Sequence, residues 1–498
     1  MSLKKNVLAN YLGTAWSALM TMAFVPLYIK YLGIEAYGLI GIFAILQSWL
    51  TLLDMGMTPS LSREMARCSS DNPSESQRLR DLLRSIEITA IGVACLIALG
   101  VWLSAPWLAG GWLKAVKIST DTVAQAIAVI GFVIGLRFIE NIYRGSLMGL
   151  QRQVLVNTIA SLIATLRGLG AVGVLIYVKA SVEYFFIWQA IVSLLGIAVF
   201  ATVVYHTLPT VQKRASFSLQ AIRSIWLFAL GSLAITLQSL LLMQVDKLML
   251  SRLLSLESFG YYTFAVMVSQ SPSMVVGPVT QAFYPRFTQA MSNNNQTELI
   301  RSYHAAAQLI TVMLASATAL LIFFGHELLM LWTKNNALTD QTYTLVAILS
   351  CGSLLNGLMN VPYFLQLAAG WTGLIVRINT VIIVIIVPLL FWLVPLYGAK
   401  GAAWVWLAIN SSYIIVSIQL MHRRLIPSEK WRWYLQDVIL PLVAAVVTAF
   451  GLKLFMPETH TMTLTIIKLA SCAFIVSLST SLAASTVRKQ IFNYLPFG

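Results

Sequence analysis

The sequence predicts an all-α polytopic membrane protein with about 14 transmembrane helices, and two observations lead to that prediction. The 498 residues are 58% hydrophobic and only 10% charged, whereas soluble proteins carry about 25% charged residues. Apolar windows of about 20 residues, long enough to cross a bilayer, recur along the whole chain. The scattered cysteines Cys68, Cys95, Cys351 and Cys472 show neither a disulfide framework nor zinc-ligand spacing. We therefore expect no metal and no cofactor.

The first apolar window follows the basic residues Lys4 and Lys5, and we interpret it as a retained first span. It is about 20 residues long, whereas the apolar region of a cleaved signal peptide has about 7–15. The loops between the windows do not exceed about 30 residues, so we expect no soluble domain on either side. The expected spans cover residues 8–29, 37–58, 86–109, 123–144, 155–178, 184–207, 225–250, 259–283, 304–324, 341–367, 374–394, 401–421, 436–456 and 461–484.

Loop charges predict the orientation of these spans, because cytoplasmic loops of membrane proteins carry an excess of Lys and Arg. With a cytoplasmic N-terminus, the inner loops hold most of the basic residues, among them Arg78, Arg80, Arg84, Arg152, Arg301, Arg423, Arg424 and Lys430. The outer side has Lys30, Lys114, Lys117, Lys179, Arg252, Lys334 and Lys400. We expect both termini in the cytoplasm. The net charge of +15 then needs no nucleic-acid partner, since no long basic block is present.

Two segments of the chain match each other at one fixed offset. YIKYLGIEAYGLIG (28–41) aligns with LSRLLSLESFGYYT (250–263). The aligned pairs include Lys30–Arg252, Glu35–Glu257 and Gly38–Gly260, and the same offset pairs Asn157-Thr158 with Asn379-Thr380. Such self-similarity predicts two parallel repeats of six spans, related by an axis along the membrane normal.

The repeat sets the domain organisation that we expect. An N-terminal six-helix bundle covers 1–223, a C-terminal six-helix bundle covers 224–430, and a helix pair at 431–498 is appended. The repeated motif itself has an ordinary structural interpretation, in which glycines flank a turn and Glu35 caps the start of the next helix. The motif therefore indicates the fold rather than a substrate site.

Three segments carry a resemblance to a known family. They are YLGIEAYGL (31–39), QVDKLMLSRLLSLESFGYY (244–262) and GLQRQVLVNT (149–158). With these motifs and its span count, the chain resembles the Wzx-type flippases, polysaccharide exporters of the MATE-like MOP superfamily. The resemblance covers nearly the whole chain and implies two V-shaped six-helix bundles around a cationic central cavity.

The resemblance also implies a function. Such flippases move undecaprenyl-diphosphate-linked oligosaccharide repeat units from the cytoplasmic to the periplasmic leaflet by alternating access, for O-antigen or exopolysaccharide assembly. We therefore expect a location in the bacterial inner membrane. Partners would be the lipid-linked oligosaccharide and membrane lipids, and a polysaccharide polymerase and chain-length proteins could join them. Proton or sodium coupling could drive the transport.

Arginines at membrane depth are the first candidates for the substrate site. Arg167 lies near the middle of its span, and Arg137 lies a few residues past the middle of the preceding one. Glu140 follows Arg137 at i+3 and shares its helical face. Charges at this depth face a bundle interior or a wet cavity, and arginine binds phosphate oxygens in a bidentate way. Glu140 or Asp54 could also form a purely structural pair with Arg167.

Other charges within the spans are weaker candidates. Asp54 lies near the cytoplasmic end of its span, and Asp246 and Lys247 are adjacent near the outer end of theirs. We consider these three residues for ion coupling or gating, although Asp54 could equally be an ordinary helix-end residue. Prolines in spans one, eight and ten predict kinks, and Pro272 and Pro278 mark span eight as a candidate hinge.

The sequence is compatible with three rival functions. A lipid II-type flippase would share the span count and the cationic cavity. A cation-coupled drug exporter of the same superfamily would need buried carboxylates rather than arginine at midplane. A membrane-embedded glycan polymerase or ligase would need a substantial outer loop with catalytic residues, and the longest outer loops have about 15 residues. No HExxH, P-loop or GxSxG motif occurs in a suitable context, so we expect a transporter and not an enzyme.

Overall fold

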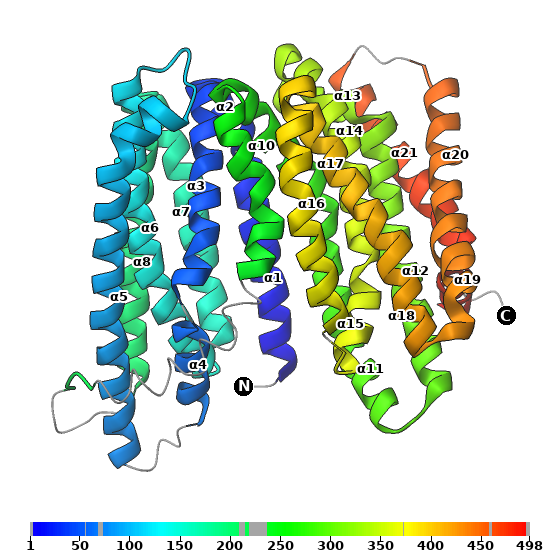
Figure 1. Cartoon of the computed structure of the whole chain (residues 1–498), viewed down its shortest axis with the longest axis horizontal. Coiled ribbons are helices and arrows are strands. Elements are labelled where there is room, and N and C mark those ends of the chain that lie inside the picture. The colour runs from blue at the N-terminus through cyan, green and yellow to red at the C-terminus, as the bar shows by residue number, and fades with distance from the viewer. Residues whose placement is uncertain are drawn as a thin grey trace. The chain divides into compact units, whose positions relative to one another are not determined.

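The computed structural model describes residues 3–54, 56–67, 73–208, 215–218, 237–371, 373–457 and 461–494. Throughout these ranges the chain is helical apart from short turns, and β-structure there is limited to an isolated bridge between Lys114 and Ser255. The contacts divide the chain into two compact units, Met1–Gly260 and Tyr261–Gly498 (Figure 1). The predicted all-α fold is thus confirmed. The predicted boundary at 223/224 lies outside the described residues and stays a prediction.

Eleven helical segments in the described ranges are long and apolar enough to cross a membrane. They are Ala9–Leu32, Glu75–Trp112, Thr120–Gly149, Gln153–Tyr177, Val182–Thr207, Gln296–Phe323, Asn336–Ala368, Gly373–Tyr397, Ala399–Leu425, Pro427–Phe455 and Met462–Ala483. Predicted span two appears as the shorter apolar helix Ile34–Leu50. Span seven lies partly outside the described residues, and span eight is divided in two. The count of 14 therefore stays a prediction.

The first unit is built from long helices that follow one another along the chain. They are α1 (Leu3–Ala23), α2 (Val25–Leu32), α3 (Ile34–Leu53), α4 (Met57–Arg67), α5 (Pro73–Trp107), α6 (Thr120–Gly149), α7 (Gln153–Tyr177) and α8 (Val182–Thr207). A further helical stretch covers 237–253, and α10 (Leu256–Gln270) begins in this unit. Helix α6 is central, because it packs against α3, α4, α5, α7 and α8.

Glycines let the two copies of the repeated motif pack against each other within the first unit. A Cβ added at Gly38, near the start of α3, would overlap the backbone carbonyl oxygen of Leu256. A Cβ added at Gly260 would overlap the carbonyl oxygen of Ile34 in the same way. These four positions are equivalent in the sequence repeat, so the two contacts are reciprocal. At these positions the two copies of the motif therefore contact each other symmetrically.

The second unit holds the remaining helices. They are η2 (Ser271–Val275), α11 (Val276–Ser292), α12 (Gln296–Phe323), α13 (Gly325–Thr333), α14 (Asn336–Leu358), α15 (Asn360–Ala368), α16 (Gly373–Tyr397), α17 (Ala399–Ser412), η3 (Tyr413–Ser417), α18 (Ile418–Leu425), η4 (Pro427–Glu429), α19 (Lys430–Arg432), η5 (Trp433–Ile439), α20 (Leu440–Phe455), α21 (Met462–Ala483) and α22 (Ser485–Tyr494). Helix α12 is central here and packs against α11, α14, α20 and α21.

Proline interrupts the helix that the sequence predicted as span eight. The chain leaves α10 at Gln270, forms the 3-10 turn η2 with Pro272 in its first positions, and resumes as α11. Proline lacks a backbone N–H and clashes with the preceding turn, which breaks the hydrogen-bond ladder of a helix. The predicted break in span eight is therefore present, and each part is too short to cross a bilayer alone.

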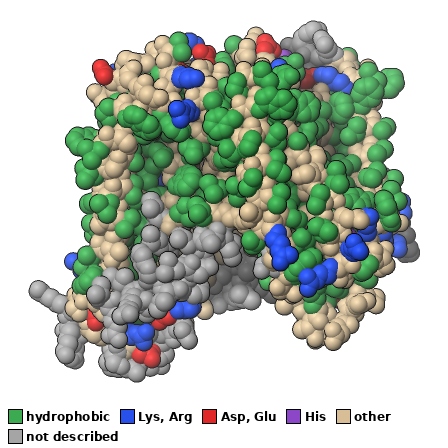
Figure 2. Space-filling view, viewed as in Figure 1, with side chains coloured by type: hydrophobic (Ala, Val, Ile, Leu, Met, Phe, Trp, Pro, Cys, Tyr) green, Lys and Arg blue, Asp and Glu red, His purple; other side chains and the backbone are tan. Residues whose placement is uncertain are grey.

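The outer surface of the helices is apolar, as lipid contact requires. Large exposed hydrophobic side chains occur on helices of both units, for example Leu96 and Leu162 in the first and Val384 and Phe391 in the second. In the second unit, Figure 2 shows Lys and Arg side chains gathered near α18 and α19, at one end of the helices. A belt of apolar surface with charge at its end is typical of a membrane protein.

Candidate functional site

Arg137 lies inside the first unit and is held by uncharged groups. Its Nη1 donates to the side-chain oxygen of Gln47 on α3, and its Nη2 donates to that of Gln189 on α8 at 3.1 Å. The guanidinium lies over the ring of Phe43, with 4.6 Å between its Cζ and the ring centroid. Among the described residues no carboxylate forms an ion pair with Arg137. Its charge is therefore positioned by three helices without being neutralised by direct contact.

Arg167 forms the ion pair of the same region. Its Nη2 lies 2.6 Å from Oε2 of Glu140 and donates to Oγ of Ser193 at 3.1 Å. The Glu140 side chain is only 5% exposed and that of Arg167 is 19% exposed. Gly196 on α8 leaves room for the carboxylate, because a Cβ there would lie 3.1 Å from Oε2 of Glu140. Of the two structural partners that the sequence offered for Arg167, the structure brings Glu140 to it.

We call the group formed by Arg137, Glu140 and Arg167 the arginine cluster. Both arginines have a buried Nε atom without a hydrogen-bond partner among the described residues. A buried polar group without a partner costs free energy, and buried charges in a membrane protein are a mark of function. The cluster has two guanidinium groups for one carboxylate, so it carries a net positive charge. It can attract an anionic ligand.

Asp54 lies at a helix end, and its side-chain hydrogen bonds are to Thr58 and not to the arginine cluster. It follows α3 and its carboxylate accepts from the backbone N–H of Thr58 at 3.1 Å and from the Thr58 hydroxyl at 2.6 Å. Thr58 is in the first turn of α4, where a carboxylate satisfies free N–H groups and complements the helix dipole. This geometry is that of an ordinary capping residue.

Asp246 and Lys247 pair with each other. Lys247 Nζ lies 3.2 Å from Oδ1 of Asp246 and also donates to the carbonyl oxygen of Met243. Two residues earlier in this helix, Gln244 donates to Oγ of Ser48 on α3 at 3.2 Å. The gating or coupling roles considered for Asp54, Asp246 and Lys247 stay predictions.

Two buried groups within the long apolar helices were not among the sequence-derived site residues. Glu87 on α5 is 3% exposed and accepts hydrogen bonds from the hydroxyls of Tyr143 and Tyr205. In the second unit, His304 lies between Asp437 and Glu429. A charged or titratable residue inside an apolar span was the available signal. What the sequence could not show was the partner, which comes from a distant span in each case.

The fold is that of transporters of the MOP superfamily. A solved structure of the lipid II flippase MurJ in an inward closed conformation aligns with a TM-score of 0.71 at 14% identity, covering 98% of this chain and 99% of that one. An inward-facing multidrug resistance MATE family transporter of the MOP superfamily aligns with a TM-score of 0.63 at 14% identity, covering 85% of this chain and 95% of that one. At such identities the likeness concerns the fold alone.

The sequence comparison identifies the family. The family model described as "Polysaccharide biosynthesis protein" matches residues 3–291, and the chain belongs to this family. A Shigella flexneri protein described as "Putative O-antigen transporter" is 20% identical over 414 residues, which is 82% of this chain and 94% of that protein. The named relatives and structural neighbours are transporters and flippases, not enzymes.

Proposed function

We propose that this protein flips undecaprenyl-diphosphate-linked oligosaccharide repeat units from the cytoplasmic to the periplasmic leaflet of the bacterial inner membrane. The movement would serve O-antigen or exopolysaccharide assembly and proceed by alternating access. Membership of the polysaccharide biosynthesis family and the description of the Shigella flexneri relative support a substrate from polysaccharide assembly. The orientation with both termini in the cytoplasm follows from the loop charges.

The observation that carries the proposal is the arginine cluster. A diphosphate that crosses a low-dielectric region needs compensating positive charge on its way. Arg137 keeps a guanidinium without a carboxylate partner among the described residues, and Arg167 shares the only carboxylate of the cluster. Arginine stays charged at any relevant pH and its planar fork fits phosphate oxygens. The cluster therefore has the charge and the donor geometry that a lipid diphosphate requires.

The proposal is tested in cells that lack the chromosomal gene. We expect Arg137→Gln and Arg167→Gln to reduce surface polysaccharide about 10-fold or more, because each removes a charge-assisted hydrogen bond of about 1.5–3 kcal/mol. Undecaprenyl-linked repeat units should accumulate in the membrane of the same cells. Arg152→Gln, which removes an exposed arginine just before α7, is the matched control and should behave like the wild type.

Immunoblots of the membrane fraction confirm that each variant is present. Wild-type polysaccharide in both cluster variants would contradict the proposal. Loss of polysaccharide in the Arg152→Gln control would show that the assay reports general loss of surface charge rather than the cluster.

A second candidate function is lipid II flipping, which the near-complete coverage of the MurJ structure favours. The diphosphate chemistry is the same, so the arginine cluster fits both lipids. Rescue of growth after depletion of the cell's own lipid II flippase would support this candidate, whereas rescue of surface polysaccharide alone supports the first. The MATE neighbours leave a drug exporter as a third candidate, which the positive charge of the cluster disfavours because cationic drugs need carboxylates.

A further inference from the structure

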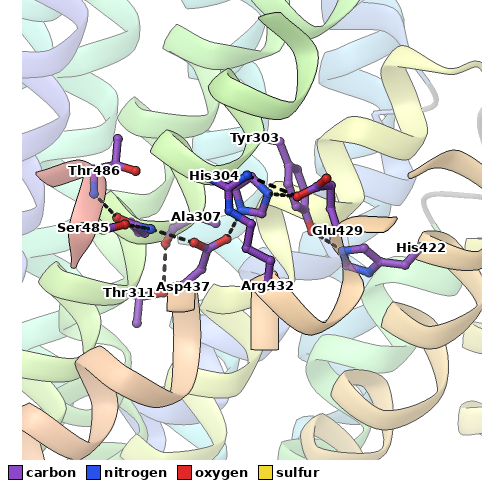
Figure 3. A network of polar contacts seen from close by, with 11 residues as sticks. Tyr303, His304, Ala307, Thr311, His422, Glu429, Arg432, Asp437, Ser485 and Thr486 are labelled. Carbon is purple, nitrogen blue, oxygen red and sulfur yellow. Dashed lines mark hydrogen bonds and ion pairs between the residues drawn. The ribbon is translucent and has the colours of Figure 1, made fainter. Parts of the chain in front are cut away.

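His304 on α12 is buried between two carboxylates in the second unit (Figure 3). Its Nδ1 contacts Oδ2 of Asp437, and its Nε2 lies 2.9 Å from Oε2 of Glu429. The side chains of His304 and Asp437 are 2% and 0% exposed, and that of Glu429 is 14% exposed. Glu429 is therefore the carboxylate through which this triad reaches solvent.

With a neutral imidazole and two ionised carboxylates, the triad contains one proton, on the ring. Its two close contacts require a second proton. A neutral imidazole has one N–H donor and one nitrogen lone pair. If both carboxylates were ionised, that lone pair would face a carboxylate oxygen at hydrogen-bond distance, and the contact would be repulsive. An added proton turns it into a hydrogen bond, on either the imidazole or the carboxyl group. Both contacts are therefore satisfied together only when the triad holds this added proton.

The triad connects three elements that are far apart in the chain. Glu429 ends η4, Asp437 lies in η5, and His304 lies one turn along α12 from Gln308. Gln308 donates to Oδ1 of Asp437 at 2.8 Å, and its side-chain oxygen accepts from the backbone N–H of Thr486 in α22 at 2.7 Å. The segment η5 is π-helical, a backbone form that often occurs at functional sites.

Several other charged and titratable side chains lie near the triad. Arg432 on α19 has its Nη1 3.3 Å from Oε2 of Glu429, and its side chain is 47% exposed. It offsets part of the charge of the Glu429 carboxylate but does not donate a proton to the histidine ring. The ring of Tyr303 on α12 packs against that of His304, and His422 on α18 lies close enough to His304 to interact with it electrostatically. Lys430 of α19 and Tyr434 of η5 lie near His422 and Tyr303, respectively. Thr486 also lines a cavity of about 350 Å³ together with the charged residues Arg286, Glu298, Arg301 and Lys489.

His422, in the same unit, is a histidine whose two ring nitrogens both have suitable hydrogen-bond partners when the ring is neutral. Its Nδ1 lies 3.0 Å from the carbonyl oxygen of Ile418 and must donate to it, and its Nε2 lies 3.3 Å from the Tyr303 hydroxyl, which can donate in return. Both ring nitrogens are thus satisfied without an extra proton. His304 differs because both of its nitrogens face acceptors that are ionised when deprotonated.

We propose that Asp437, His304 and Glu429 form a proton-binding site, and that the bound proton holds the segment Pro427–Ile439 against α12. The proton comes from water on the Glu429 side, forms an N–H or O–H bond within the triad, and returns to water when the site empties. When the proton is lost, the buried triad carries one more negative charge. One contact between a ring nitrogen of His304 and a carboxylate oxygen then becomes repulsive. Segment Pro427–Ile439 then loosens, and with it the Gln308 link to α22.

The triad is a hydrogen-bonding site rather than a metal site. Each ring nitrogen contacts a different carboxylate, so the donors do not converge on one point as metal ligands do. Within the described residues, no group of His, Cys, Asp and Glu has an arrangement that could hold a metal ion. The inference goes beyond the proposed function, because proton binding here does not depend on which lipid the protein moves.

The test is hydrogen–deuterium exchange of the purified full-length protein in lipid nanodiscs, without any lipid-linked substrate. Exchange in peptides covering 427–439 is followed from about pH 5 to about pH 9 and corrected for the intrinsic pH dependence of exchange. We expect protection of the wild type to fall about 10-fold or more as the pH rises. Glu429→Gln and Asp437→Asn should stay protected throughout, because an amide N–H donates to the ring nitrogen without an extra proton.

The matched control is His422→Gln, which should keep the wild-type pH profile. The proposal is overturned if wild-type protection does not change with pH, if the two amide variants keep the wild-type profile, or if they exchange fast at every pH. Because the measurement contains no substrate, failure here leaves the proposed function standing, and failure of the transport tests leaves the proton site standing.

Discussion

At the residue scale, the sequence predicted which charged side chains lie inside the helix bundle better than it predicted what they touch. The spacing of Arg137 and Glu140 places both on one face of α6, and the structure has both in the interior of the first unit. Arg167 reaches Glu140 from the next helix, with Ser193 of α8 as a second acceptor. That choice depends on how α6, α7 and α8 pack, which periodicity along one helix cannot specify.

The ion pair of Arg167 and Glu140 gives a prediction about stability. Arg167→Met alone leaves the Glu140 carboxylate buried without its cation, and we expect a loss of about 3–5 kcal/mol in the free energy of unfolding. The double variant Arg167→Met/Glu140→Met should recover most of that loss, because it removes both buried charges together. Denaturation of the purified variants in mixed micelles measures both values.

Flipping should be lost in the single and in the double variant alike, since both lack Arg167. A double variant that is as unstable as Arg167→Met would contradict the ion-pair interpretation. A stable double variant with wild-type flipping would instead remove Arg167 from the proposed substrate route.

The triad around His304 was missed from the sequence for a comparable reason. His304 and Asp437 both stand in predicted apolar spans, 304–324 and 436–456, and each is unusual there. No local pattern joins them, because they are separated by 133 positions in the chain. Such a pair becomes visible only when α12 and η5 are packed together.

At the element scale, the helices and their interruptions follow closely from composition. Apolar length predicted the position of most helices, and proline chemistry predicted the break between α10 and α11. The helix boundaries were less accurate where polar residues continue a helix beyond the apolar window. Helix α5 begins at Pro73 rather than near residue 86, because its first turns are polar and lie outside the apolar pattern.

The reciprocal glycine contact predicts matched effects at two distant positions. Gly38→Ala and Gly260→Ala should each lower the free energy of unfolding by about 1–3 kcal/mol, because the new Cβ would overlap a backbone carbonyl oxygen that cannot move aside. Gly92→Ala in α5, where an added Cβ meets nothing within 4 Å, is the control and should be neutral or slightly stabilising. Thermal unfolding of the purified variants measures this, and a neutral Gly38→Ala would show that the close contact is absent.

The interruption at η2 predicts opposite effects on stability and transport. Replacing Pro272 and Pro278 by Ala removes two helix breakers. The gain from a continuous helix from α10 into α11 should exceed the added entropy of the unfolded chain and stabilise the protein by about 1 kcal/mol or more. Transport should fall, because a continuous helix bends less easily at this position. Unfolding of the purified double variant and surface polysaccharide in complemented cells check the two effects. Unchanged transport in this variant would exclude a hinge here.

At the scale of the whole molecule, the fold by itself does not choose the substrate. The MurJ and MATE structures that align with this chain are described as moving different substrates, a lipid and drugs. What distinguishes the candidates is the sign of the charge inside the helices. The arginine cluster of the first unit is positive, which matches a lipid diphosphate and not a cationic drug.

The most direct test of this account is leaflet-specific detection of a labelled undecaprenyl-diphosphate oligosaccharide in proteoliposomes that contain the purified protein. We predict that the wild type moves the lipid to the opposite leaflet faster than protein-free liposomes do, and that Arg137→Gln slows this movement about 10-fold or more, while Arg152→Gln does not. Movement by the wild type no faster than in protein-free liposomes, or equal rates for the wild type and Arg137→Gln, would contradict the account.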